Sequence, residues 1–377
     1  MQATREVIIV IRKKIENLSP ISIILLVSII VVLFLSIYLT VFVCAEQIEP
    51  STAPQAEIDV PQMTASHLQA SGTLSKPSYL FLVAGRDAVS GLTDVILLVK
   101  FDVEQKIINI IQIPRDTYLR YTDRAYKKIN AATYVLGGLE GLAELLEQTW
   151  SIDIDYTVEF TIETFSHLID LIGGVPINIP YDMDYEDASQ ELYIHLKAGE
   201  NILYGNEAVQ FVRFRSGYVQ GDIARIDAQK IFLAALAQKI TSGVGTFKLP
   251  AIIGALIGEV KTNLSLSDCI SFVRAALNVD MSNIVMVTLS GKDARTGGNS
   301  GAWYYIINRS AALEIINRYL ITSENIILSD NFDSDRLFSN TAYPHFEEIY
   351  YAESYSIQEY RADDINKDGI DICLVDQ

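Results

Sequence analysis

Two aspartates stand at the edges of short apolar segments in the first third of the chain. Asp87 follows the segment Tyr79–Ala84 after a glycine and an arginine, and Asp94 immediately precedes the segment Val95–Phe101. If both segments are neighbouring strands, the two carboxylates can meet at one point, and hard divalent cations such as Mg²⁺ take oxygen ligands of this kind. The alternative is that each aspartate caps a turn, as aspartate commonly does. The spacing leaves both interpretations open.

A third apolar segment, Ile107–Ile113, runs straight into proline, Arg115 and Asp116. In open α/β sheets ligands bind at strand ends, so Arg115 is a candidate for contact with a ligand. The alternative is a surface ion pair or a turn formed by Arg115 and Asp116. Lys128 follows in what should be the next loop or the start of a helix.

The densest group of candidates comes later in the chain. Arg213, Arg215 and Arg225 lie within 13 residues, with Asp222 and Gln229 close by. Arg225 and Gln229 are four residues apart and would therefore share one side of a helix. Planar guanidinium groups suit bidentate binding of phosphate, so the cluster favours an anionic ligand. The alternative is that these arginines pair with aspartates and glutamates of the same chain.

Composition and missing motifs argue against several other functions. A formal net charge of −18 opposes nucleic-acid binding, which needs Lys and Arg to displace counterions from phosphates. Three cysteines and four histidines show no CxxC, HExxH or comparable spacing, so no zinc site is expected. The GxSxG, GxxxxGKS/T and SxxK signatures are also missing. With 50% hydrophobic residues, the chain can nevertheless bury a sizeable core.

Residues 20–43 form a long uncharged apolar segment. As a helix, these 24 residues would rise about 36 Å, enough to cross about 30 Å of hydrocarbon. Basic residues precede the segment and acidic residues follow it, so a cytoplasmic N-terminus (1–19) and an extracellular remainder are predicted. The alternative, a cleaved signal peptide, has a shorter apolar stretch and a small residue at the cleavage site. We therefore expect a single-pass protein of the cell membrane.

An extracellular linker, which contains four prolines, is expected over 44–77. After it, short apolar runs alternate with longer segments whose apolar residues have helical spacing. Strands are expected at Tyr79–Ala84, Val95–Phe101, Ile107–Ile113, Tyr156–Phe160, Val175–Ile179 and Asn283–Leu289. Helices are expected within Ala125–Trp150, with an interruption at Gly137-Gly138, and over Glu163–Ile172, Glu207–Arg215, Ile223–Thr241, Leu249–Val260, Ser267–Leu277 and Asn308–Leu320. This alternation predicts a layered α/β domain over 78–322, followed by a mostly irregular extension over 323–377.

The order of the motifs resembles the LytR–CpsA–Psr family, whose members were first described as cell-envelope-related transcriptional attenuators. The motifs are Gly-x-Asp from residue 85, Thr-Asp from 93, Ile-Pro-Arg-Asp-Thr-Tyr from 113, Lys-Ile-Asn-Ala-Ala from 128, Gly-Gly-Val-Pro-Ile-Asn-Ile-Pro from 173, Val-Arg-Phe-Arg from 212 and Gly-Asp-Ile-Ala-Arg from 221. The similarity runs from about residue 78 to residue 320 and so covers nearly all of the predicted domain.

The resemblance implies a three-layer α/β/α sandwich with a mixed central sheet and an apolar groove for a polyprenyl tail. It implies a phosphotransferase that moves a glycopolymer (teichoic acid, capsule or similar) from an undecaprenyl-pyrophosphate carrier to peptidoglycan at the outer face of the membrane. By position, Asp87 and Asp94 would hold Mg²⁺. The implied pyrophosphate ligands are Arg115, Arg213, Arg215, Arg225, Gln229 and Lys128, and the implied catalytic residues are Asp94, Arg115 and Asp222, with either aspartate as the base.

Two other functions remain open on the sequence alone. One is a protein that binds the lipid carrier or a wall glycan without turnover. The other is an enzyme that hydrolyses the polyprenyl pyrophosphate, in which water attacks in place of a sugar hydroxyl.

Overall fold

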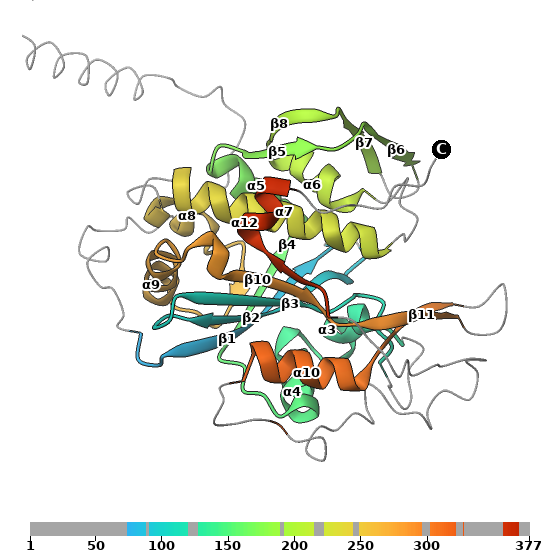
Figure 1. The fold of residues 1–377 in the computed structure, drawn as a ribbon, viewed down its shortest axis with the longest axis vertical. Coiled ribbons are helices and arrows are strands. Elements are labelled where there is room, and N and C mark those ends of the chain that lie inside the picture. The colour runs from blue at the N-terminus through green and yellow to red at the C-terminus, as the bar shows by residue number, and fades with distance from the viewer. Residues whose placement is uncertain are drawn as a thin grey trace, which may run out of the picture. The chain divides into compact units, whose positions relative to one another are not determined.

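The structure is a computed structural model that describes residues 74–87, 90–119, 127–188, 192–214, 222–243, 249–295, 302–321, 327 and 357–368 (Figure 1). Within these ranges the side chains of residues 222–225, 243, 249–250, 295 and 366–368 are not described. Contacts divide the chain into two units, Met1–Met63 and Thr64–Gln377, of which the first lies wholly outside the described residues.

Residues 1–19, 20–43 and most of the predicted linker 44–77 lie outside the described residues. In the part of the chain that is described, no helix is both long enough and apolar enough to cross a membrane.

A seven-stranded mixed sheet forms the centre of the fold, in the order β13-β10-β3-β2-β1-β4-β9. Its strands are β1 (Ser78–Arg86), β2 (Thr93–Asp102), β3 (Ile107–Gln112), β4 (Tyr156–Thr161), β9 (Lys261–Thr262), β10 (Ile284–Thr288) and β13 (Glu359–Arg361). β2 is antiparallel to β1 and β3, whereas β4 runs parallel to β1 and β10 runs parallel to β3. The predicted α/β class with a mixed central sheet is therefore confirmed.

Helices cover both faces of this sheet (Figure 1). One layer contains α3 (Ala132–Val135), α4 (Leu139–Trp150) and α10 (Arg309–Tyr319), and the other contains α7 (Asp222–Gly243), α9 (Leu266–Ala276) and α12 (Ala362–Asp368). Successive side chains of a strand point to opposite faces, so Leu80 and Leu82 of β1 join the core under α4 and α10. Tyr79 and Phe81 join the core under α7 and α9. The helix–sheet–helix layering follows from this alternation.

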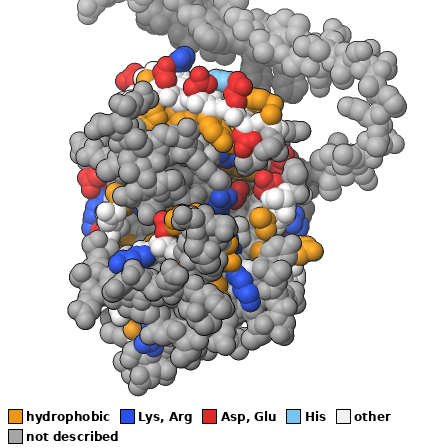
Figure 2. Space-filling model, turned by 90° about the vertical axis from the view of Figure 1, so that its right-hand side faces the viewer, with side chains coloured by type: hydrophobic (Ala, Val, Ile, Leu, Met, Phe, Trp, Pro, Cys, Tyr) orange, Lys and Arg blue, Asp and Glu red, His pale blue; other side chains and the backbone are white. Residues whose placement is uncertain are grey.

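A second packed region lies beside α7 and was only partly predicted. It contains the strand pairs β5 (Val175–Ile179) with β8 (Gly199–Leu203) and β6 (Met183–Asp187) with β7 (Leu192–Leu196), and the helices α5 (Ile162–Leu171), α6 (Gly205–Arg213) and α8 (Leu249–Leu256). Among these strands, the sequence pattern predicts only β5. Each of the four has five residues. β7, for instance, alternates buried Ile194 with exposed Tyr193 and His195, so no continuous apolar run marks it. Figure 2 shows acidic side chains beside hydrophobic ones on this region, at the top of the view.

The C-terminal part of the chain completes the central sheet. β13 pairs with β10, and Ala362 and Ile365 of α12 are buried in the same core as Phe272 of α9. The sequence predicts a mostly irregular extension over 323–377, and within it residues 357–368 contain a strand and a helix. A further hairpin, β11 (Gly291–Arg295) with β12 (Trp303–Ile307), was also not predicted.

Candidate active site

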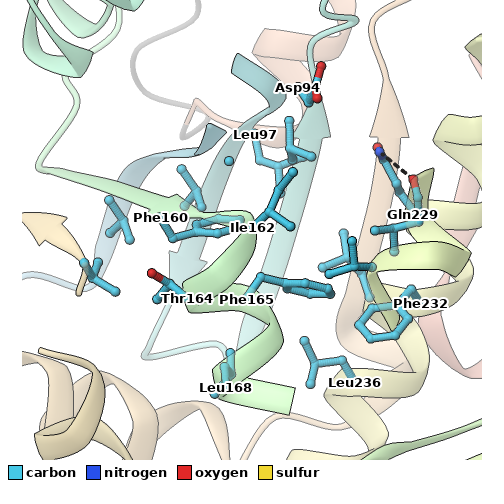
Figure 3. A pocket seen from close by; sticks show the side chains of 18 of the residues that line it. Asp94, Leu97, Phe160, Ile162, Thr164, Phe165, Leu168, Gln229, Phe232 and Leu236 are labelled. Atoms are coloured by element: carbon cyan, nitrogen blue, oxygen red, sulfur yellow. Dashed lines mark hydrogen bonds between the residues drawn. The ribbon is translucent and has the colours of Figure 1, made fainter. Parts of the chain in front are cut away.

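An apolar cavity of about 340 Å³ lies between the central sheet and helices α5, α6 and α7 (Figure 3). Val83 and Gly85 of β1 line it because they point to the same face of the sheet as Phe81. A Cβ atom at Gly85 would lie 3.1 Å from the Phe160 ring and 3.3 Å from Val95 Cβ. Glycine therefore keeps this wall of the cavity open.

Helix α7 supplies the opposite wall. Gln229, Phe232, Leu233 and Leu236 all line the cavity, and their spacing of three, four and seven residues places them on one side of a helix. In Figure 3, Asp94 and Gln229 lie in the upper part of the view and Leu236 lies in the lower part. The cavity thus has a polar end and an apolar end.

Asp94 and Arg115 meet at the polar end. The Asp94 carboxylate accepts a hydrogen bond from Arg115 Nη1 at 2.5 Å, and the two side chains are 26% and 17% exposed. The register explains the contact, because Leu97 of β2 lies opposite Gln112 of β3 in an antiparallel pair. Residues just before Leu97 therefore adjoin residues just after Gln112. The structure brings together two candidates that the sequence placed at separate strand ends.

Lys128 is joined to this pair through Asp116. Lys128 Nζ donates to Asp116 Oδ1 at 2.7 Å, and the other oxygen of Asp116 lies 3.8 Å from Arg115 Nε. The backbone supports the arrangement, since the Asn130 N–H donates to the Arg115 carbonyl at 3.1 Å. Arg115 is therefore in contact with Asp116, as the alternative interpretation predicted, but its shorter contact is with Asp94.

Arg213 and Gln229 also line the cavity. Arg213 is the last residue of α6 and forms no ion pair with any residue that the structure describes. Gln229 Oε1 accepts a hydrogen bond from Gln112 Nε2 at 2.7 Å, and Gln229 Nε2 lies 3.5 Å from the Val212 carbonyl oxygen (Figure 3). Arg213, Gln229 and Asp94 therefore line one cavity although they are far apart in sequence.

The structure describes the contacts of only one of the four remaining candidates, which are Asp87, Arg215, Asp222 and Arg225. Asp87 Oδ1 accepts from the Ser90 N–H at 3.1 Å, which is the turn-capping contact of the alternative interpretation. Arg215 lies outside the described residues. Asp222 and Arg225 belong to α7, but their side chains are not described.

The aspartates fit a magnesium ion only in part. Among the described residues, no group of three or more histidines, cysteines, aspartates and glutamates could hold a metal ion. Protein sites for Mg²⁺ often contain just one or two carboxylates, and substrate phosphates supply further oxygens. Asp94 on the cavity wall and Asp87 at the end of the same hairpin suit a site of that kind.

Gln112, whose buried amide bonds to Gln229, is not among the candidate site residues predicted from the sequence. A signal was present, because Gln112 interrupts the apolar run from Ile107 to Ile113 in a strand that is otherwise apolar except for Asn109. A polar side chain is rarely buried in such a strand without a hydrogen-bond partner.

Comparison with known proteins gives the chain a family. The sequence profile of the LytR_cpsA_psr family matches residues 36–320, which is more than half of the chain. The chain belongs to the LytR_cpsA_psr family. The resemblance drawn from the motifs is thereby confirmed.

Two relatives show how far the similarity of this LytR_cpsA_psr chain extends. It is 29% identical over 234 residues to the polyisoprenyl-teichoic acid–peptidoglycan teichoic acid transferase TagV of Bacillus subtilis, a match that covers 61% of this chain and 59% of TagV. It is 32% identical over 188 residues to the regulatory protein MsrR of Staphylococcus aureus, covering 48% of this chain and 55% of MsrR. The chain therefore spans less than two thirds of the length of either relative.

The fold of this LytR_cpsA_psr chain is also similar to that of a solved structure. The crystal structure of B. subtilis TagV superimposes with a TM-score of 0.56 at 25% sequence identity. The superposition covers 69% of this chain and 99% of the TagV chain in the crystal. The described α/β architecture is therefore shared over almost the whole of that structure.

Proposed function

We propose that this chain transfers a glycopolymer from a polyprenyl-diphosphate carrier to peptidoglycan. The observation that carries the proposal is the cavity itself, which is apolar at one end and bears Asp94, Arg213 and Gln229 among its lining residues. A polyprenyl diphosphate has the same division into a long hydrocarbon chain and a compact anionic head. TagV, a relative of this chain, is named as a polyisoprenyl-teichoic acid–peptidoglycan teichoic acid transferase, which supports the choice of donor and acceptor.

The apolar end supplies binding energy for the hydrocarbon. Each CH₂ group removed from water contributes about 0.8 kcal/mol, so a few isoprene units are enough to hold the carrier. Phe165, Phe232 and Leu236 line this part of the cavity. Only the first units of the prenyl chain need to enter for the head group to be positioned.

The polar end supplies charge for the diphosphate. Guanidinium groups form bidentate hydrogen bonds to phosphate oxygens. Arg115 contacts Asp94 at this end, and Arg213 is one of the residues that line the cavity. Because the whole chain carries a formal charge of −18, a local cluster of arginines is needed to attract an anion. Arg215, Arg225 and Lys128 extend the proposed cluster.

The proposed reaction is a displacement at the phosphorus that bears the glycan. A hydroxyl oxygen of a peptidoglycan sugar forms the new P–O bond, the bond to the bridging oxygen breaks, and polyprenyl phosphate leaves. Asp94 or Asp222 takes the hydroxyl proton. Arginines stabilise charge that develops on the phosphoryl oxygens. Mg²⁺ held by Asp87 and Asp94 would add further neutralisation of the diphosphate charge.

The proposal includes a location. A membrane anchor at residues 20–43 with positive charge on its N-terminal side would place the domain outside the cell membrane. Both the lipid carrier and peptidoglycan would then be within reach of one active site.

The test uses the full chain in detergent with a synthetic polyprenyl-diphosphate glycan, peptidoglycan fragments and Mg²⁺. Release of polyprenyl phosphate and attachment of glycan to the fragments are followed together. We expect Arg115→Ala to lower the turnover rate by about 100-fold, the effect typical of removing one donor to a developing oxyanion. Arg318→Ala is the matched control, because Arg318 pairs with Glu314 on α10, on the other side of the sheet.

Each outcome separates the three candidate functions. Release of polyprenyl phosphate with glycan on the fragments supports transfer. Release that yields free glycan phosphate would instead establish a hydrolase. Tight binding of the lipid without any release would leave a binding protein, and the transferase proposal would then be wrong.

A further inference from the structure

Gln112 ends β3 on the side of the sheet that faces α7, and its side chain is buried. Only 5% of the residue is exposed, in a strand that is otherwise mostly apolar. Its neighbours in the register are Leu97, which lines the cavity, and Thr288 of β10. Burying an amide costs free energy unless hydrogen bonds compensate for lost water. The contacts of Gln112 therefore need an explanation.

Gln112, Gln229 and the Val212 carbonyl are linked by two successive hydrogen bonds, and each bond has a defined donor. The Val212 carbonyl oxygen can only accept, so it orients the Gln229 amide nitrogen toward itself at 3.5 Å. Gln229 Oε1 then accepts from Gln112 Nε2 at 2.7 Å. If both amides were flipped, Gln229 Oε1 would face the Val212 oxygen, and two acceptors would repel each other. The Val212 carbonyl and the shorter bond from Gln112 therefore hold the Gln229 amide in one orientation together.

At the Gln112 end of these hydrogen bonds, a buried oxygen lacks a donor among the described residues. Gln112 Oε1 is buried and has no hydrogen-bond partner among the described residues. A buried acceptor without a partner is costly, whereas replacing both amides with apolar groups of similar shape would remove that cost. The pair is therefore poorly explained by stability alone. Buried polar groups that break this rule are characteristic of functional sites.

We propose that Gln112 is a positioning residue for Gln229. By donating to the amide oxygen of Gln229, it directs that oxygen toward itself, and the N–H that does not bond to Val212 is left for a ligand in the cavity. An N–H group attracts an anionic oxygen, whereas a carbonyl oxygen would repel it. The inference rests on the proposed function and specifies it, because it makes Gln229 an obligatory donor to the diphosphate.

The test measures binding of inorganic pyrophosphate and farnesyl diphosphate to the full chain by calorimetry. We expect Gln112→Met, which keeps the length of the side chain but removes its donor, to weaken binding about tenfold. In a Gln229→Met background, the same substitution should change the affinity no further, because the group that Gln112 positions is gone. Equal weakening in both backgrounds would show a general structural role and overturn the inference.

A second variant tests the direction of the hydrogen bond. In Gln112→Glu the ionised carboxylate can only accept, so it should turn the Gln229 amide around and weaken binding at about pH 8. At about pH 5 the buried carboxyl group can regain a proton and donate again, so the affinity relative to wild type should recover. An unchanged ratio of the two affinities from pH 8 to pH 5 would contradict the proposal.

Two controls keep the inference separate from the proposed function. Asn109→Leu removes another amide of β3, which donates to the Tyr319 carbonyl away from the cavity, and should leave diphosphate binding unchanged. If wild type itself binds neither diphosphate, the proposed function fails. If wild type binds and Gln112→Met and Gln112→Glu bind equally well, only the role of Gln112 is wrong.

Discussion

Gln229 and Lys230 are consecutive on α7 and almost equally buried, with 7% and 4% of each residue exposed, yet their surroundings differ. Gln229 lines the apolar cavity and bonds to a neutral amide. Lys230 Nζ lies 3.2 Å from Asp227 Oδ1 on the same helix. It also lies 4.2 Å from the ring centre of Tyr360 on β13, in the C-terminal part of the chain. One helix therefore separates two polar environments.

The difference shows what each side of α7 does. A neutral amide can be buried at modest cost, whereas a buried ammonium group needs a carboxylate and an aromatic ring to compensate for lost water. Burial lowers the pKa of Lys230, and the nearby Asp227 opposes that lowering. The family match ends at residue 320, before Tyr360. All residues that line the cavity thus lie within the family match, whereas Lys230 contacts a segment that follows it.

The largest expected effect comes from loosening that later segment. Ile365 of α12 is 4% exposed and belongs to the core beneath α7. Ile365→Ala should lower the free energy of unfolding by about 3 kcal/mol, because it leaves a cavity in the core. Urea unfolding measures this change, and Asp364→Ala at the exposed neighbouring position is the control. Pyrophosphate binding by the folded variant should stay at the wild-type level; weaker binding would break the separation between the two sides.

On the cavity side, Leu236→Trp should affect the ligand rather than the fold. The larger side chain fills space at the apolar end, opposite Asp94 and Gln229. Loss of contacts for two or three CH₂ groups should weaken binding of farnesyl diphosphate by about 30-fold. Binding of inorganic pyrophosphate, measured on the same preparation, should not change. Equal losses for both ligands would place the hydrocarbon elsewhere.

Much of the central sheet could be predicted because its strands are continuous apolar runs. The segments around Leu82, Leu98 and Ile111 are mostly apolar because helices cover both faces of the sheet, and Lys100, Asn109 and Gln112 are their polar exceptions. The same reasoning placed Asp94 and Arg115 at strand ends. Their direct contact depends on the register of β2 and β3, which the sequence does not state.

Other features depend on contacts between distant segments. The alternation in β7 is consistent with a strand only once α6 is known to cover one face of it. The motif comparison picked out Gln229, but nothing in the sequence near Lys230 indicates that Tyr360, 130 residues later, lies over its ammonium group. Gln112 was a visible exception in an apolar strand, yet its partner lies 117 residues away.

A smaller effect is expected from the Lys230 pair itself. Lys230→Met should lower the free energy of unfolding by about 1.5 kcal/mol, since it leaves the Asp227 carboxylate without its ammonium partner. Adding Asp227→Leu should restore most of the loss, because both members of the pair are then apolar. Denaturant unfolding of the two variants decides between these results. A double variant less stable than Lys230→Met would mean that Asp227 has another essential partner.

The smallest expected effect is the pH dependence of the same pair. Lys230 holds its proton up to about its ordinary pKa of 10.5 in the unfolded chain but loses it at lower pH in the folded protein, because burial lowers its pKa. Between these values the unfolded chain binds more protons, so the contribution of Lys230 to stability rises with pH.

Burial and Asp227 raise the pKa of the facing Tyr360, so its titration has the opposite sign. The comparison is therefore made in a Tyr360→Phe background. From about pH 8 to pH 10 the unfolding free energy should rise relative to the same protein carrying Lys230→Met. A constant difference would show that Lys230 keeps its proton in the folded protein throughout this range.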